Sequence, residues 1–593
     1  MRGLPVVAGA VSLGLIWMSN AAMAGPGEDL QALFADEWAN RLQENPLFAS
    51  FAGEHAYDHL MPSATPAAHD RRAKQDAAYL DRLHGIGRAE LAAADQLNYD
   101  LFEFVISHRV RSSVYRGYRI PFVSDSGFFT NITFAFERAR LKTLEDYENY
   151  IARLEAMPGW FAEHTANMRQ GLEDGFTMPS VILGNMEPII GAMAGEAPED
   201  SIFYRPFKSL PEHFEPAERQ RLVAAARKAI EEGVMPAYKA FHVFFRDEYM
   251  PGARPTLGAT ELPGGEDYYA YLVSYYTTLE ITPEEIHQLG LDEVARIRAE
   301  MEAIIEEVAF EGTFKEFLTF LRTDPQFYAT TPEQLLKEAA WIAKQIDGQM
   351  PAFFGRLPRM PYGVAPVPAH LAPNYTTGRY IGSRPGATRG GYYWVNTYAL
   401  DKRPLYVLPA LTLHEGVPGH HHQISLSQEL ENVPKFRQSL YPHAFGEGWG
   451  LYSEKLGIEF GVYKTPYENF GRLTYEMWRA GRLVVDTGLH LMGWSRQQAV
   501  DLFVENSALS IHNINTEVDR YISWPGQALA YKMGELTILR LRAQATEALG
   551  ARFDLRRFHD AVIGAGGIPL NILEARIAAW IAAEQAAQAK EAE

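Results

Sequence analysis

The sequence contains no cysteine among its 593 residues. This absence excludes disulfides, thiolate metal ligands and a cysteine-linked lipid anchor together. Any metal must therefore be held by His, Asp or Glu. Stability has to come from a hydrophobic core, which a chain of this length with 47% hydrophobic residues can build.

Positive charge is also scarce, because 55 Lys and Arg stand against 74 Asp and Glu, for a net charge of −19. A chain this acidic repels nucleic acid and anionic lipid unless it carries a local basic patch, and the sequence shows none. We therefore expect no nucleic-acid partner. The G-x-S-x-G motif is missing too, which disfavours a serine hydrolase.

Long hydrophobic runs are confined to the N-terminus, where Arg2 precedes an apolar stretch over residues 3–18 and then Ala22-Met23-Ala24. This order is typical of a signal peptide cleaved after an A-x-A site, and the run is short for a membrane span of ~20 residues. Residues 1–24 are therefore predicted to be removed. We expect a periplasmic or secreted protein that begins at Gly25 and has no stable membrane insertion.

Helix start signals recur along the rest of the chain. Capping boxes begin at Thr282, Thr465 and Ser495, and Thr331 opens a similar segment. Residues 351–385 hold seven of the 35 prolines, which excludes a long helix, and the aromatic, β-branched stretch 392–397 predicts a strand. The sequence thus predicts a mainly α protein, with an N-terminal helical body over 25–350 and a catalytic region over 351–593.

The motif HEGVPGHHHQ over 414–423 predicts a metal site with unusual spacing. In H-E-x-x-H the second ligand comes four residues after the first, but here that position is Pro418. On a regular helix His420 would lie about 120° off the face of His414, and His421 would lie about 10.5 Å along the axis. Two ligands of one zinc are only about 3.4 Å apart. Pro418 and Gly419 therefore predict a distortion that brings His420 to His414, with His421 as the alternative ligand.

A third ligand is expected from the stretch GEGWGLYSE over 446–454. Glu447 is our candidate, because its flanking glycines allow close helix packing, while Glu454 could serve as an outer carboxylate to a ligand histidine. His443 remains possible as a ligand. The competing interpretation is that the histidines form a pH-sensitive surface or a set of hydrogen-bonded core imidazoles.

The segment 414–421, together with Glu447-Gly448-Trp449, resembles a bacterial domain-of-unknown-function family, number eight-eight-five. The resemblance extends to 486–495, 517–521 and 525–528 with Tyr531, and so over nearly the whole mature chain. The family looks like a distant branch of the zincin metallopeptidases, of the type with a glutamate third ligand. This resemblance implies a large multi-helix zincin-like fold, a small β-sheet near the active site, Zn²⁺ as cofactor, and a peptide or small amide as substrate.

Supporting residues follow from the chemistry of amide hydrolysis at zinc. Glu415 is placed as the base by its position next to His414. Tyr531 or His490 is expected to donate to the oxyanion, because both lie in stretches that resemble family motifs; a buried structural tyrosine is the alternative for Tyr531. Arg520 is a candidate for a substrate carboxylate, although neighbouring acids offer a plain salt bridge.

The predicted strand is a further candidate for substrate binding, through Tyr393 and Asn396, because an exposed strand can pair with an extended peptide. It could equally be an ordinary structural strand. Taken together, the sequence predicts a zinc-dependent peptidase. The alternatives are a zinc hydrolase of non-peptide amides or esters, and a non-catalytic zinc-binding scaffold, against which the retention of Glu415 argues.

Overall fold

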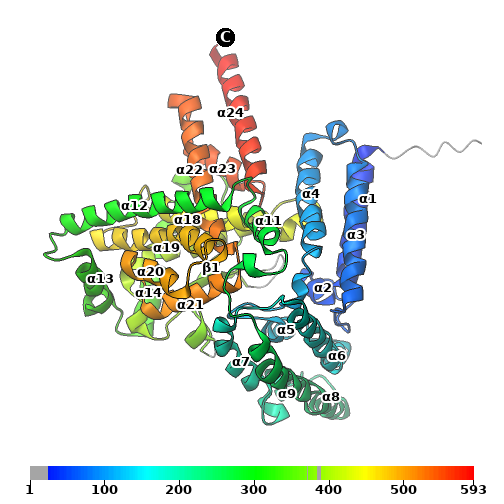
Figure 1. The fold of residues 1–593 in the computed structure, drawn as a ribbon. Coiled ribbons are helices and arrows are strands. Elements are labelled where there is room, and N and C mark those ends of the chain that lie inside the picture. Colours follow the sequence, from blue (N-terminus) through cyan, green and yellow to red (C-terminus); the bar gives the residue numbers. More distant parts are fainter. Residues whose placement is uncertain (1–24, 370, 384–388, 593) are drawn as a thin grey trace, which may run out of the picture.

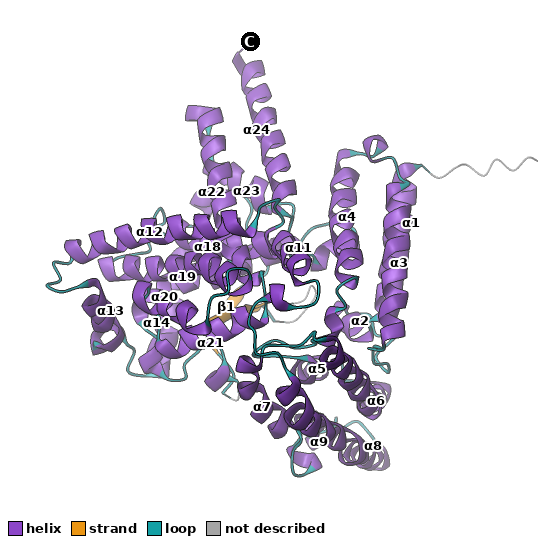
Figure 2. Cartoon of the chain, viewed as in Figure 1, coloured by secondary structure: helices purple, strands orange, loops and turns teal. Residues whose placement is uncertain are grey.

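The computed structural model describes residues 25–369, 371–383 and 389–592 (Figure 1). It is mainly helical with one three-stranded sheet, which confirms the predicted mainly α class (Figure 2). The predicted signal peptide, residues 1–24, lies outside the described residues. Over the described part of the chain, no helix combines the length and the apolar character needed to span a membrane.

The first part of the chain forms a series of helices around an aromatic-rich core. In this part α3 packs on α4, and α6 packs on α8 and α9. Phe128, Phe161 and Phe241 meet in edge-to-face contacts that fix α5, α6 and α9 to one another. The helices of this part are α1 (Pro26–Glu44), α2 (Pro46–Ala52), α3 (Pro66–His84), α4 (Ala93–Ser113), α5 (Phe128–Glu137), α6 (Leu144–Asp174), α7 (Met186–Met193), α8 (Pro216–Ala229), α9 (Met235–Phe244) and α10 (Met250–Gly252).

The second part holds the longer helices, several of which begin where the sequence predicts. Thr282, Thr331, Thr465 and Ser495 each accept a hydrogen bond from the third residue of the helix that follows, which confirms these starts. The helices are α11 (Gly265–Thr277), α12 (Pro283–Glu307), α13 (Phe314–Thr323), α14 (Pro332–Asp347), α15 (Met350–Phe353), α16 (Leu408–Glu415), α17 (His420–Gln428), α18 (His443–Leu456), α19 (Pro466–His490), α20 (Arg496–Asn506), α21 (Ile511–Ser523), α22 (Ala530–Leu549), α23 (Leu555–Ile563) and α24 (Leu570–Ala592).

Helix α19 is the centre of this part, since every residue from Phe470 to His490 is buried. Helices α12, α16 and α18 pack on it, and α18 packs closely on α22. A Cβ at Gly290 would lie 2.7 Å from Leu483 Cβ, so glycine is needed where α12 crosses α19. Because α12 and α14 precede residue 350 but pack on α19 and α16, the boundary at 350 stays a prediction.

The sheet consists of β1 (Tyr362–Pro366), β2 (Gly378–Ile381) and β3 (Gly391–Val395) in the order β1-β3-β2. Strand β3, which corresponds to the strand predicted over 392–397, pairs in parallel with β1 and antiparallel with β2. Among the described strands β2 therefore lies at an edge. It contacts α16, so the sheet places this edge beside the helix that carries the motif.

Candidate metal centre

The helix that carries the motif is interrupted where the sequence predicts. Helix α16 ends at Glu415 and α17 begins at His420, and Gly419 between them has a non-helical ψ of −128°. The indole of Trp449 donates a hydrogen bond of 2.7 Å to the carbonyl of Pro418, which ties the interruption to α18. The predicted distortion between 416 and 420 is thus confirmed.

The break brings two histidines and a glutamate together. Glu447 Oε2 lies 3.6 Å from His414 Nε2 and 3.4 Å from His420 Nε2, and one ligand atom from each residue lies within 4.8 Å of the others. Two ligands about 2.1 Å from one tetrahedral zinc are separated by roughly 3.4 Å. The donor set and its spacing therefore fit a zinc ion with an open coordination position.

A second layer of contacts orients these ligands. His414 Nδ1 lies 2.8 Å from Glu454 Oε1, and Arg479 Nη2 lies 3.3 Å from the same oxygen. Gln423 Nε2 lies 2.8 Å from His420 Nδ1 and donates at 2.8 Å to the carbonyl of Gly446. Both imidazoles are thereby held at Nδ1 with Nε2 turned towards Glu447. Glu454 is the kind of acceptor that usually stands behind a metal-bound histidine, whereas the Gln423 amide nitrogen fixes the ring of His420 as a donor. Glu454 has the position predicted for an outer carboxylate.

The glycines around Glu447 make room for the site. A Cβ at Gly450 would lie 2.6 Å from Cε1 of His414, so the ring packs directly on the backbone of α18. Gly448 meets Gly534 of α22, and Gly446 faces the ring of Tyr441. Gly450, Gly448 and Gly446 thus make room, in that order, for the His414 ring, for the crossing of α18 and α22, and for the ring of Tyr441.

The site is rich in negative charge. Burial lowers the pKa of His414, but contacts with Glu447 and Glu454 outweigh it and raise the pKa to about 9. Burial raises the pKa of Glu447, but the neighbouring His420 and His414 bring it well below its usual range. Three carboxylates, including Glu415, surround two imidazoles, and a divalent cation would offset this charge.

The predicted base lies beside the triad. Glu415 Oε2 accepts a hydrogen bond of 2.7 Å from the backbone N–H of Tyr380 in β2. Glu415 lines a cavity of about 360 Å³ together with His414, His420, Glu447 and Tyr531. The structure therefore brings the predicted ligands, base and one predicted oxyanion donor to the same cavity.

His490 does not join them, which corrects the predicted donor role. The residue is 0% exposed and does not line the cavity. Its Nδ1 accepts from the N–H of Ala259 at 3.1 Å, and its Nε2 lies 2.9 Å from the carbonyl of Tyr521. Burial lowers the pKa of His490 to about 4. Both nitrogens are occupied by backbone groups, so this imidazole is part of the core.

The substrate-binding roles predicted for Tyr393 and Asn396 are also corrected. Tyr393 is 0% exposed, and β3 is paired on both sides and has no free edge. The Asn396 amide donates to the carbonyls of Ala372, Tyr375 and Thr376 at 2.9–3.1 Å. Asn396 therefore holds the segment that leads into β2, and the edge strand near Glu415 is β2.

The two alternative ligands lie outside the triad. His421 Nδ1 lies 3.0 Å from the hydroxyl of Tyr380, and its ring packs on Tyr362. His443 lines the cavity but is not among the three grouped ligands. His420 is thus the histidine that the interruption brings to His414.

Arg520 lies on the cavity wall, with its donors already engaged. Its Nη2 donates to Glu517 at 2.9 Å and its Nη1 donates to Gln527 at 2.7 Å, as the plain salt-bridge interpretation expects. Sequence reasoning missed Arg482 and Arg379, which line the same cavity. The signal for Arg482 was weak, because it is one of three arginines, with Arg472 and Arg479, in the long helical segment that follows Thr465.

These features define a class: a large helical protein in which two histidines and a glutamate form a candidate metal centre beside a small sheet. The chain belongs to the family described as "Bacterial protein of unknown function (DUF885)", whose model matches residues 46–577. Among curated proteins, none matches.

Two solved structures are similar over almost the whole chain, and each is described as a "putative lipoprotein". The protein from Colwellia psychrerythraea has 26% identity and a TM-score of 0.88, with 94% of this chain and 99% of that chain covered. The protein from Shewanella oneidensis, of unknown function, has 17% identity and a TM-score of 0.71, with 93% and 99% covered. The second likeness concerns the fold alone.

Proposed function

We propose that this chain is an exported, zinc-dependent hydrolase of peptide bonds with a zincin-like catalytic region. His414, His420 and Glu447 hold the metal, and Glu415 is the general base. The observation that carries the proposal is the separation of 3.4 and 3.6 Å between the histidine nitrogens and the Glu447 carboxylate, next to Glu415 in one cavity.

A zinc ion held by this set supplies Lewis acidity towards the substrate carbonyl and the attacking water. Glu415 accepts a proton from the water as its oxygen bonds to the carbonyl carbon. The same carboxyl then passes the proton to the amide nitrogen while the C–N bond breaks, which leaves a free acid and a free amine. The N–H of Tyr380 fixes one Glu415 oxygen, so the other serves the proton transfer.

The cavity wall supplies the remaining functions. Tyr531 donates a hydrogen bond to the carbonyl oxygen as negative charge develops on it. An extended peptide can lie along the edge strand β2 and pair with its backbone groups other than the Tyr380 N–H, which Glu415 occupies. This edge takes the role that the sequence had assigned to β3.

Export is part of the proposal. The N-terminal pattern of Arg2, an apolar run and Ala22-Met23-Ala24 supports a cleaved signal peptide. The word lipoprotein in the description of the Colwellia relative also fits an exported chain. N-terminal sequencing of the protein recovered from the periplasm should begin at Gly25, and uncleaved protein in the cytosol would contradict export.

The catalytic proposal is tested with Glu415→Gln, which keeps the size of the side chain and removes its basicity. We expect the variant to keep about one zinc by elemental analysis and to lose about 10²-fold or more in peptide turnover. The matched control is Glu459→Gln, which removes a carboxylate paired with Arg542 at 2.7 Å on the surface and should leave both readouts unchanged.

The substrate is identified with a broad peptide library and mass spectrometry of the products. If Glu415→Gln cleaves peptides as fast as the wild type, Glu415 is not the general base. Zinc binding by the wild type without any cleavage would instead support the scaffold alternative.

A further inference from the structure

The cavity that is lined by the metal triad has two parts of different charge. We call them the metal pole, which holds the triad, and the arginine pole, which is positively charged. The metal pole contains Glu415 and Glu447, and Arg479 belongs to it through its contact with Glu454. Three further arginines line the same cavity, namely Arg379, Arg482 and Arg520. Glu517 is the carboxylate that pairs with the last two.

Arg482 is the most deeply buried of these three arginines. It is 3% exposed, and its Nε and Nη2 donate to the Tyr521 hydroxyl at 2.8 Å and to Glu517 at 3.0 Å. Its buried Nη1 has no hydrogen-bond partner among the described residues. The guanidinium lies 4.4 Å from the ring centre of Tyr531, which also lines the cavity. A buried N–H donor without a partner is costly, so this position favours an acceptor supplied from the cavity.

The positive charge of the arginine pole is only partly compensated, because three arginines face two carboxylates, Glu517 and Asp125, which line the same cavity. Glu517 Oε2 is shared by Arg482 at 3.0 Å and Arg520 at 2.9 Å, so one negative charge faces two positive ones. Arg379 on β2 forms no ion pair with a carboxylate in the described part of the chain, and its guanidinium lies 5.5 Å from the ring centre of Tyr375. The net positive charge of this wall favours an anion.

We infer that this pole binds the C-terminal carboxylate of the substrate, with Arg482 Nη1 as the principal donor. The inference rests on the proposed function and makes the protein a C-terminal exopeptidase. Arg482, Arg379 and Arg520 form one wall of a cavity of about 360 Å³, near the lower end of ligand pockets, so only a short C-terminal piece fits beside the metal. Guanidinium groups suit this task because they present paired donors to a carboxylate.

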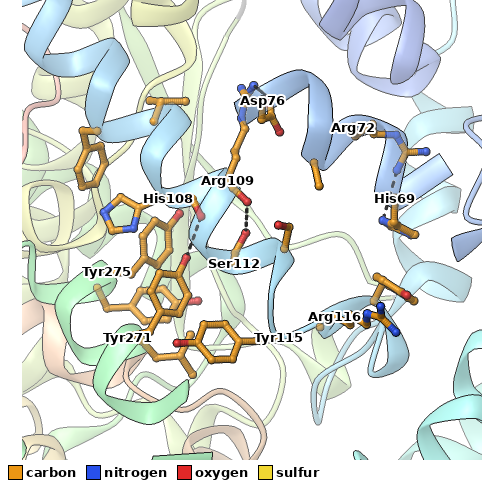
Figure 3. Close-up of a pocket in the computed structure, with 18 of the residues that line it drawn as sticks. His69, Arg72, Asp76, His108, Arg109, Ser112, Tyr115, Arg116, Tyr271 and Tyr275 are labelled. Atoms are coloured by element: carbon orange, nitrogen blue, oxygen red, sulfur yellow. Dashed lines mark hydrogen bonds and ion pairs between the residues drawn. The ribbon is translucent and has the colours of Figure 1, made fainter. Parts of the chain in front are cut away.

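Space for the remainder of the peptide adjoins this cavity. A second cavity of about 690 Å³ adjoins the first through Tyr441 and His443, which line both. Figure 3 shows its aromatic wall, where Tyr115 stacks on Tyr271 with ring centres 5.3 Å apart. A peptide whose carboxylate lies at Arg482 can therefore continue into this second cavity.

The inference is tested by calorimetric titration of zinc-loaded Glu415→Gln, which binds substrate without rapid cleavage. The probes are N-acetyl-Tyr-Ala-Ala and its C-terminal amide. We expect the free acid to bind about tenfold or more tightly than the amide, because the amide loses a charge-assisted hydrogen bond. Equal affinity for the two peptides, or failure of the acid to bind, overturns the inference.

Arginine variants in the same background locate the effect. Arg482→Met should bring the affinity for the acid to within about threefold of that for the amide, and Arg379→Gln should reduce the preference in part. Arg496→Met is the matched control: it removes an arginine paired with Asp519 at 2.7 Å outside the cavity and should keep the preference. A retained preference in both Arg482→Met and Arg379→Gln contradicts the assignment.

Zinc content and circular dichroism are measured for each variant. They distinguish weaker peptide binding from loss of the metal or of the fold. If Arg482→Met does not fold, the exposed Arg379 carries the test. The outcome is distinguishable from that of the proposed function. Cleavage of amidated peptides without preference for the acid supports the peptidase activity and rejects the carboxylate site. Selective binding of the acid without any cleavage supports the carboxylate site and rejects the peptidase activity.

Discussion

His414 and His490 are both buried imidazoles in the same half of the molecule, yet their surroundings are opposite. His414 faces the carboxylates of Glu454 and Glu447, whereas His490 lies between the backbone N–H of Ala259 and the carbonyl of Tyr521. The pKa of His414 is raised to about 9 by these carboxylates against the effect of burial, and burial lowers that of His490 to about 4. The partner, not the burial, decides what each ring can do.

The opposite pKa shifts of His414 and His490 follow from the chemistry of their hydrogen-bond partners. Backbone groups complement a neutral imidazole, because one nitrogen accepts and the other donates. Carboxylates on both sides of a ring favour positive charge, which either a proton or a metal ion can supply. A histidine next to a glutamate in the sequence therefore becomes a ligand candidate only when the fold adds a second and a third acid.

The largest expected contrast is in metal content. His414→Ala should lose the zinc and all peptide turnover, because a three-ligand site is reduced to two. His490→Ala should keep about one zinc per folded molecule, although it leaves two buried backbone groups unpaired and costs about 3 kcal/mol of unfolding free energy. Elemental analysis of the folded fractions measures both. Zinc retained in His414→Ala would remove this residue from the ligand set.

The next effect is on the pH dependence of stability. The folded-state pKa of His490, about 4, lies below the ordinary value of about 6.5, so only the unfolded chain takes up this proton as the pH falls between the two. Stability is unaffected above about pH 6.5 and falls by about 3 kcal/mol by pH 4 through this group. Urea unfolding of metal-free protein at pH 7 and pH 4 measures the loss. His490→Gln should show a correspondingly smaller loss, and an identical loss would contradict the assignment.

Much of the fold and of the site could be predicted from local sequence. Capping residues such as Thr465 specify where helices begin, because the hydrogen bonds they make span only three residues. The interruption between Glu415 and His420 was predictable for the same reason, since Pro418 and Gly419 act on their own segment of backbone. The spacing then made His420 the first candidate to reach His414, with His421 as the alternative.

The predictions that failed depend on contacts between segments that are distant in the sequence. Strand β3 was recognised by composition, but its place between β1 and β2 depends on pairings with short strands that have no distinctive pattern of their own. Tyr393 was therefore a candidate for substrate binding, but it lies in the core. Arg482 was overlooked because its partner Glu517 is 35 residues away. Likewise, nothing local to His490 shows that Ala259 supplies its hydrogen bond.

A smaller effect on zinc affinity is expected from Glu454, whose carboxylate contacts Nδ1 of His414. Glu454→Gln removes the carboxylate 2.8 Å from His414 Nδ1 and should weaken zinc binding by 10- to 100-fold, the usual range for an outer-shell partner. Competition with a chelator of known affinity measures the change. The same substitution at Glu459, which pairs with Arg542 on the surface, is the control and should leave zinc affinity unchanged. Unaltered affinity in Glu454→Gln would show that the carboxylate does not support the ligand.

The smallest effect comes from adding one methyl group. In Gly450→Ala the new Cβ would lie 2.6 Å from Cε1 of His414, so the ring must shift away from α18 and from its position towards Glu447. We expect zinc affinity to fall about tenfold, or about 1.4 kcal/mol. Gly159→Ala in α6 is the matched control, because nothing lies within 4 Å of its added Cβ. That variant should gain about 0.4–1 kcal/mol of stability and keep its zinc affinity. Equal zinc affinities in the two variants would mean that the His414 ring can move without cost, and that the glycine at 450 is not required by the metal centre.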